Sequence, residues 1–147
     1  MFNHEKLWQD YAALTGRGVK TDSGEMVSWY EAHSQRIRLS QGDNWDGGGA
    51  VIIIPAYNEE KLLPRTLASV NMAMNSIPEG IKFRVVVVNN ASSDATKEVA
   101  KEFGAIVVDE PIKGIGRARQ AGLEATESRD TYVLTTDADA VVPEDWL

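Results

Sequence analysis

The residues best suited to chemistry are two aspartates, Asp137 and Asp139, separated by one alanine and placed directly after the apolar run Tyr132–Thr136. Two carboxylates so close together beside an apolar segment repel each other unless a cation lies between them. Mg²⁺ and Mn²⁺ prefer oxygen ligands and leave coordination positions for phosphate oxygens. The alternative is a solvated turn, because Asp-x-Asp is common by chance. The position at the end of a predicted strand favours a metal site.

A second candidate is the basic stretch Lys113–Arg119, which opens a predicted helix over 114–127. Glycines let a ligand approach the backbone, and a helix N-terminus with nearby cations attracts anions. The alternative is an exposed basic turn. The stretch is not G-x-G-x-x-G after a first strand, which argues against a Rossmann dinucleotide site. The chain contains no G-x-x-x-x-G-K-[ST], which excludes an ordinary P-loop.

Two further polar stretches follow apolar runs. Tyr57, Asn58 and Glu59 could stack on a base and hydrogen-bond to a ribose. They could equally begin a helix, with Asn58 as its N-cap and Glu59 near the positive end of its dipole. Asn90 and Asp94 follow the next run, and Asp94 has the same alternative role as a helix cap.

Four apolar, β-branched runs precede these polar stretches: 50–54, 83–88, 105–108 and 132–136. Helical patterns lie between them, beginning around 61–63, 93–94 and 114, and Pro143 with Glu144 predicts the start of another helix. This alternation predicts an α/β fold with a parallel sheet and right-handed crossovers. Continuous apolar strands indicate a sheet covered on both faces. The four polar stretches should then meet at the carboxyl edge of the sheet, where α/β folds bind ligands.

The segment before the triple glycine at 47–49 differs from the rest. It holds three of the four Trp residues, and Leu7, Tyr11 and Leu14 recur at helical spacing before Gly16. We therefore predict a mostly helical N-terminal extension over residues 1–49, which could dock a partner or cover the main domain. The main domain is predicted to span residues 50–147.

Composition excludes several classes of function. The 147 residues include 15 Lys+Arg and 22 Asp+Glu, for a net charge of -7, which argues against nucleic-acid binding. The absence of cysteine excludes disulfides, thiol nucleophiles and Cys-ligated zinc. No apolar run approaches the ~20 residues of a transmembrane segment, and the start has no signal-peptide core. The expectation is a soluble cytoplasmic protein, with a membrane-peripheral location as the alternative.

Four segments together resemble the nucleotide-binding half of family 2 glycosyltransferases of the GT-A fold: Val51–Glu60, Val85–Thr96, Lys113–Gly122 and Asp137–Leu147. They occur in the family's order and spacing. The resemblance implies a Rossmann-like parallel sheet that binds a nucleotide-diphosphate sugar with Mn²⁺ or Mg²⁺. It implies transfer of the sugar, with inversion, to a saccharide, lipid or other acceptor. A UDP-sugar is the first expectation for the donor, and a GDP-sugar is the second.

The resemblance also suggests which residues contact the donor: Pro55, Tyr57 and Glu59 around the base and ribose, Asn90 at the nucleoside, Lys113, Gly114 and Arg119 near the base and diphosphate, and Asp137. Asp137 and Asp139 match the family's metal-binding pair, the DXD motif, with Asp139 as the direct ligand. The sequence departs from the family where Asn89 and Asn90 replace the commoner carboxylates and where Gln120 replaces Asn.

The family's general base, an Asp or Glu well downstream of the metal motif, would lie beyond Leu147. We therefore expect a donor-binding portion truncated after the DXD motif, which transfers sugar poorly by itself. Unpaired strand edges would favour self-association. The rival from another class is a non-catalytic nucleotide-binding or protein-interaction module, which would need neither aspartate. A pyrophosphorylase or methyltransferase is disfavoured because the first loop lacks glycine.

Overall fold

The computed structural model of the protein describes residues 49–77 and 81–147. The predicted N-terminal extension therefore lies outside the described residues, except for Gly49. Strands and helices alternate as predicted, in the order β1 (Gly49–Ala56), α3 (Leu63–Asn75), β2 (Lys82–Asn90), α4 (Thr96–Glu102), β3 (Ile106–Glu110), α5 (Ile115–Glu124) and β4 (Asp130–Thr135).

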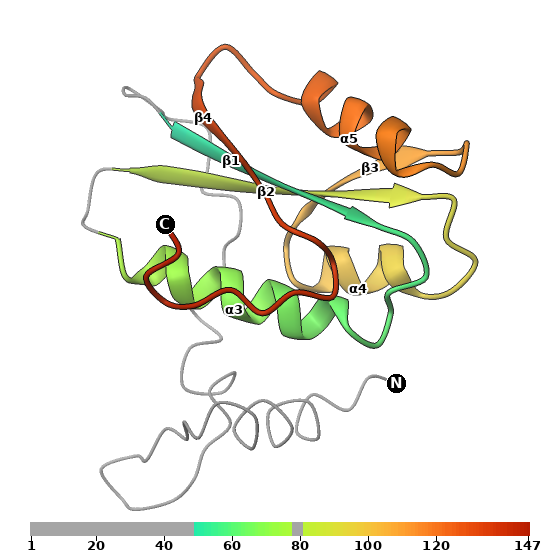
Figure 1. Ribbon diagram of the computed structural model, residues 1–147, viewed down its shortest axis with the longest axis horizontal. Helices are drawn as coiled ribbons and strands as arrows, with labels where there is room; N and C mark the ends of the chain where they lie inside the picture. The colour runs from blue at the N-terminus through green and yellow to red at the C-terminus, as the bar shows by residue number, and fades with distance from the viewer. Residues whose placement is uncertain (1–48, 78–80) are drawn as a thin grey trace, which may run out of the picture. The chain divides into compact units, whose positions relative to one another are not determined.

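The four strands form one sheet in the order β3-β2-β1-β4, and every neighbouring pair is parallel (Figure 1). The predicted α/β fold with a parallel sheet is confirmed. In the register, Ala56 at the end of β1 pairs with Asn89 near the end of β2. Because parallel strands run in the same direction, the residues that follow all four strands lie at the same carboxyl edge.

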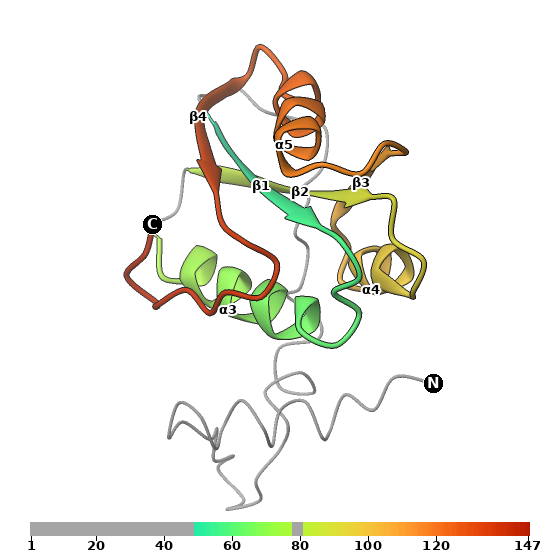
Figure 2. The same ribbon diagram turned by 45° about the vertical axis from the view of Figure 1, so that its right-hand side comes forward.

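The helices cover the two faces of this sheet unequally. Helices α3 and α4 lie on one face and α5 on the other, as both views show (Figures 1 and 2). Val51, Ile53, Val86 and Val88 form a buried cluster with Ala118 of α5. The remaining apolar side chains of β1 and β2 face α3 and α4, because side chains alternate along a strand.

The expectation of a sheet covered on both faces is confirmed for β1 and β2, in which nearly every residue is buried. It does not hold for β4, where Tyr132 is 64% and Val133 is 49% exposed. In the sheet described here, β3 and β4 are the outer strands. Self-association through such an edge remains a prediction.

The segment that follows β4 runs along α3 (Figures 1 and 2). Two hydroxyl groups of α3 hold its backbone: Thr66 Oγ1 donates to the carbonyl oxygen of Ala138 at 2.7 Å, and Val142 N donates to Ser69 Oγ at 3.1 Å. The prediction of a helix beginning at Pro143 is wrong. Residues 143–147 contain a turn, closed by a hydrogen bond from Trp146 N to the Pro143 carbonyl oxygen at 3.1 Å.

In the described ranges, no helix combines the length and the apolar character needed to cross a membrane.

Candidate functional site

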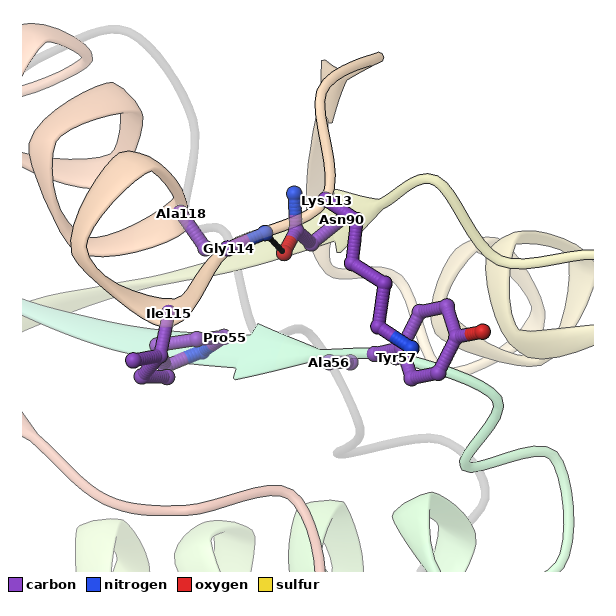
Figure 3. Close-up of a pocket in the computed structure, with 8 residues that line it drawn as sticks. All are labelled: Pro55, Ala56, Tyr57, Asn90, Lys113, Gly114, Ile115 and Ala118. Carbon is purple, nitrogen blue, oxygen red and sulfur yellow. Dashed lines mark hydrogen bonds between the residues drawn. The ribbon is translucent and has the colours of Figure 1, made fainter.

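A pocket of about 220 Å³ opens at the carboxyl edge of the sheet, between the ends of β1 and β2 and the start of α5 (Figure 3). Eight residues line it: Pro55, Ala56, Tyr57, Asn90, Lys113, Gly114, Ile115 and Ala118. Five of these residues were predicted from the sequence as donor contacts. The parallel sheet brings them together, although they come from three separate stretches of the chain.

Lys113 and Tyr57 form one wall of the pocket. The Lys113 side chain reaches from the loop before α5 to the Tyr57 ring, and its Nζ lies 3.8 Å from the ring centroid (Figure 3). An ammonium at this distance is attracted by the electrons of the aromatic face. Tyr57 keeps 40% of its surface exposed. The pocket therefore combines a flat aromatic surface with a cation that can also bind an anion.

Asn90 and Gly114 line the pocket next to Lys113. The Asn90 side chain is nearly buried, and its Oδ1 accepts a hydrogen bond from Gly114 N at 2.8 Å. Gly114 has a φ of 157°, a conformation that residues with a side chain rarely adopt. The glycine that precedes α5 is thus required by the backbone at this position.

Asp137 and Asp139 lie outside the pocket lining, in the segment after β4. Both are exposed, whereas Ala138 between them is buried and bonded to Thr66. Arg65 Nη2 donates to the carbonyl oxygen of Asp139 at 3.4 Å. The buried alanine therefore anchors the motif to α3 while both carboxylates stay accessible.

Arg119 is the predicted residue that connects α5 to this motif. Its Nη2 lies 3.7 Å from Asp137 Oδ1, and both side chains are more than half exposed. An exposed pair at this distance contributes little to stability. The pair places a cation and a carboxylate side by side at the carboxyl edge of the sheet.

Glu59 extends the acidic character of the edge. Partial burial raises the pKa of its carboxyl group, and the negative charges of Asp139 and Asp94 raise it further. The Glu59 and Asp139 carboxylates therefore repel each other electrostatically. A cation bound there would relieve the repulsion.

The loops after β1 and β2 bind each other. Asn58 Oδ1 accepts a hydrogen bond from Ser93 N at 2.8 Å, and Asp94 Oδ2 accepts one from Glu60 N at 3.1 Å. The reading of Asn58 as the N-cap of the next helix is therefore wrong. That helix begins at Leu63 without a side-chain cap.

Asp94 has a structural role at the start of α4, although Ala95 and not Asp94 is the N-cap of that helix. Asp94 Oδ1 accepts a hydrogen bond from the backbone N–H of Thr96, the first residue of α4, at 3.0 Å. Burial opposes its ionisation, but the hydrogen bonds from Thr96 and Glu60 lower its pKa on balance.

Sequence reasoning missed three residues of α3 that hold the acidic motif: Arg65, Thr66 and Ser69. They contact residues 72 to 74 positions further along the chain. No local pattern marks such contacts. The only hint in the sequence is that two small hydroxyl residues, Thr66 and Ser69, lie three positions apart on the buried face of a helix.

The parallel sheet and its flanking helices have the GT-A fold, which is the fold of glycosyltransferases among the structural neighbours. Residues 51–147 match the family described as Glycosyl transferase family 2, and the chain belongs to this family.

Three comparisons illustrate the relationship. An uncharacterized glycosyltransferase of Mycobacterium tuberculosis is 38% identical over 91 residues, which cover 62% of this chain and 38% of the relative. A dolichyl-phosphate beta-glucosyltransferase of Trichomonas vaginalis is 40% identical over 97 residues, which cover 60% of this chain and 29% of the relative. The structure of S. aureus TarS 1-349 in complex with UDP-GlcNAc is 27% identical, with a TM-score of 0.56, and the match covers 67% of this chain and 28% of that one. The chain thus spans less than two-fifths of each of these proteins.

Proposed function

We propose that this chain binds the nucleotide part of a nucleoside-diphosphate sugar, a UDP-sugar in the first instance, for transfer of the sugar to an acceptor. The observation that carries the proposal is the pocket in which Lys113 lies over the Tyr57 ring. Family membership supports a transferase, and TarS with UDP-GlcNAc supports the choice of donor.

The size of the pocket supports a division of the donor between two places. Pockets that enclose a whole drug-sized ligand have volumes of roughly 300–1,000 Å³. This pocket, at about 220 Å³, is large enough for only part of a nucleotide sugar. We assign the base and ribose to the pocket, with Pro55 and Glu59 beside them. The diphosphate would extend toward Lys113 and Arg119.

Asp137 and Asp139 are proposed to hold Mg²⁺ or Mn²⁺, with Asp139 as the direct ligand. Their carboxylate oxygens are the hard donors that these ions prefer. In residues 49–77 and 81–147, no group of three or more His, Cys, Asp or Glu side chains is placed to hold a metal ion. The phosphate oxygens of the donor would therefore complete the coordination. When bound, the metal supplies positive charge that stabilises the leaving diphosphate.

The proposed reaction inverts the anomeric carbon. A hydroxyl oxygen of the acceptor attacks that carbon while its bond to the diphosphate oxygen breaks, and a general base takes the hydroxyl proton. The base is assigned to none of the described residues. In this proposal the chain contributes donor binding, with Arg119 and Lys113 attracting the negative charge of the diphosphate.

The test is a calorimetric titration of the chain with UDP, GDP and dTDP, each in the presence of Mn²⁺ and again in excess EDTA. We expect UDP to bind, and to bind more weakly in EDTA. Asp139→Asn should remove this metal dependence, whereas Asp145→Asn, which changes an exposed carboxylate of the same segment, should retain it. If neither EDTA nor Asp139→Asn changed the affinity for UDP, the metal assignment would be contradicted and a non-catalytic module would be favoured. No binding of any of the three nucleotides to a folded chain would contradict the proposed function.

A further inference from the structure

The side chain of Asn90 is directed into the protein's own backbone. Asn90 ends β2 on the wall of the pocket and is 4% exposed. Its Nδ2 donates to the carbonyl oxygens of Ile112 at 2.8 Å and Glu110 at 3.3 Å. Its Oδ1 accepts from Gly114 N at 2.8 Å (Figure 3). All three partners belong to residues 110–114, the last residue of β3 and the connection to α5, which we call the loop 110–114.

These bonds use both hydrogens of the amide group. An amide offers two donors and a carbonyl oxygen with two lone pairs, so one lone pair of Oδ1 is what is left for any ligand. A carboxylate at this position could accept from Gly114 but would have no proton for the two carbonyl oxygens. An amide therefore fits this loop, and an ionised carboxylate does not.

The loop that Asn90 holds includes Lys113, the cation that lines the pocket. Lys113 extends from the loop to Tyr57, and Gly114 precedes the first residue of α5. Within the loop, Ile112 N donates to Glu110 Oε1 at 2.7 Å, which gives the turn a second support. The conformation of the loop thus determines where the Lys113 ammonium lies.

We propose that Asn90 is a positioning residue, which fixes the loop 110–114 and acts on the nucleotide through Lys113. This inference rests on the proposed function of the pocket. It differs from the expectation that Asn90 itself contacts the nucleoside. It also gives a physical reason for the amide in place of the carboxylate that is commoner in the family.

The first test needs no nucleotide. Amide hydrogen exchange at Gly114 is measured by NMR in the ligand-free chain and in Asn90→Ala. Loss of the Oδ1 acceptor should increase the exchange rate of Gly114 about tenfold or more. Asn89→Ala is the matched control, because the neighbouring Asn89 amide donates to Asp109 Oδ1 at 2.9 Å and makes no hydrogen bond to the loop. Its Gly114 exchange rate should equal that of the unsubstituted chain.

The second test uses UDP and Asn90→Asp. At about pH 8 the new carboxylate faces two carbonyl oxygens, and UDP should bind about tenfold more weakly than to the unsubstituted chain. Burial and the carbonyl oxygens raise the pKa of such a carboxyl group. At about pH 5 the protonated form regains one donor, and the difference should shrink to about threefold. Both proteins are compared at each pH, so that ionisation of UDP itself cancels. Asn89→Asp should show no such pH-dependent difference.

Two results would overturn the inference: Asn90→Asp binding UDP as tightly as the unsubstituted chain at pH 8, or unchanged Gly114 exchange in Asn90→Ala. Should Asn90→Ala not fold, the exchange rate of Gly114 is measured on Asn90→Leu, which has a similar shape and likewise lacks the Oδ1 acceptor, with the same expectation. A folded chain that binds no UDP contradicts the proposed function alone, because the exchange comparison still decides the role of Asn90.

Discussion

Lys113 Nζ lies 3.8 Å from the centroid of the Tyr57 ring, so a cation from the loop before α5 covers an aromatic face that follows β1. A base that stacks on this face must displace the ammonium group. The diphosphate of a nucleotide can then receive the displaced charge. A nucleoside without phosphates offers no such exchange.

The Lys113→Met variant should therefore affect two ligands in opposite directions. Uridine should bind somewhat more tightly, because an exposed cation–π contact worth about 0.5–1 kcal/mol no longer competes for the ring. UDP should bind about tenfold more weakly, because it loses a charged partner worth about 1.5 kcal/mol or more. Calorimetric titration of both ligands measures this crossover. Lys101→Met, which removes an exposed charge from the end of α4, is the control, and equal weakening of both ligands would contradict the prediction.

Thr66 gives a prediction about the acidic motif. Its side chain is fully buried and donates to the carbonyl oxygen of Ala138 at 2.7 Å. Thr66→Val keeps the shape and removes the donor, which leaves a buried carbonyl unsatisfied at a cost of about 1–3 kcal/mol. The metal-dependent part of UDP binding should also weaken, while uridine binding changes little.

Urea denaturation and calorimetry of Thr66→Val measure these two effects. Ser76→Ala is the control, because its exposed hydroxyl bonds only to Met72 of the same helix. Its stability should stay within about 0.5 kcal/mol of the unsubstituted chain. If Thr66→Val changed neither the stability nor the metal dependence of UDP binding, the prediction that α3 holds the acidic motif in place would be wrong.

The elements were predictable from the sequence because their signals are local. The run 50–54 is apolar without interruption and mostly β-branched, and it lies within β1, one of the two inner strands. The position of Asp137 and Asp139 at a strand end followed from the same pattern. The bonds that hold the site could not be predicted, because Thr66 meets Ala138 across 72 residues and Asn90 meets Gly114 across 24.

The failed helix at Pro143 has the same origin. Proline followed by glutamate is typical of a first helical turn. In the fold, Val142 N donates to Ser69 Oγ of α3, and a turn closed by Trp146 N and the Pro143 carbonyl oxygen follows. The contact with α3 joins residues 73 positions apart, so the local pattern at Pro143 does not contain it.

Glu59 predicts a dependence of stability on pH. Its pKa is raised above the ordinary value of 4.5 in the folded chain, first by burial and then by the charges of Asp139 and Asp94. A carboxyl group of this kind favours the folded state below its unfolded pKa, and that contribution is lost as the pH rises through the folded value. Glutamine does not ionise, so Glu59→Gln does not lose this contribution as the pH rises. The free energy of unfolding of the variant, relative to that of the unsubstituted chain, should therefore increase from about pH 4 to about pH 7.

Urea midpoints of Glu59→Gln at these two pH values provide the measurement. Glu102→Gln, which changes an exposed residue at the end of α4, is the control for a general change in net charge. A relative stability of Glu59→Gln that falls as the pH rises would reverse the sign and contradict the assignment.

Arg84 and Asp130 lie near the beginnings of β2 and β4, at the edge of the sheet opposite the pocket. Their ion pair leads to a prediction about stability. Their side chains form an ion pair in which the Arg84 side chain is 5% exposed and the Asp130 side chain is fully buried. Burial disfavours the charged carboxyl, but the hydrogen bonds from Arg84 and the Glu127 backbone lower its pKa on balance. Arg84→Met leaves this carboxylate buried without its partner, at an expected cost of about 3–5 kcal/mol.

The double variant Arg84→Met/Asp130→Leu provides the decisive comparison. Replacing both charges by apolar side chains is often neutral, so it should recover most of the stability that the single variant loses. Thermal and urea denaturation measure the three free energies of unfolding. A double variant as unstable as Arg84→Met alone would show that the pair stabilises the fold by more than mutual neutralisation.

Replacing either of two glycines of α5 by alanine should change the stability of the chain in opposite directions. A Cβ at Gly122 would lie 2.3 Å from Ile53 Cγ2 of β1 and 3.2 Å from Val88 Cγ2 of β2, whereas a Cβ at Gly116 would meet no atom within 4 Å. Gly122→Ala should therefore destabilise the chain by about 1–3 kcal/mol, because the buried strands must shift to admit the methyl group. Gly116→Ala should stabilise it by up to about 1 kcal/mol, because alanine is the better helix former. Urea denaturation of both variants checks the contrast, and equal effects of the two substitutions would contradict the close packing of α5 on β1.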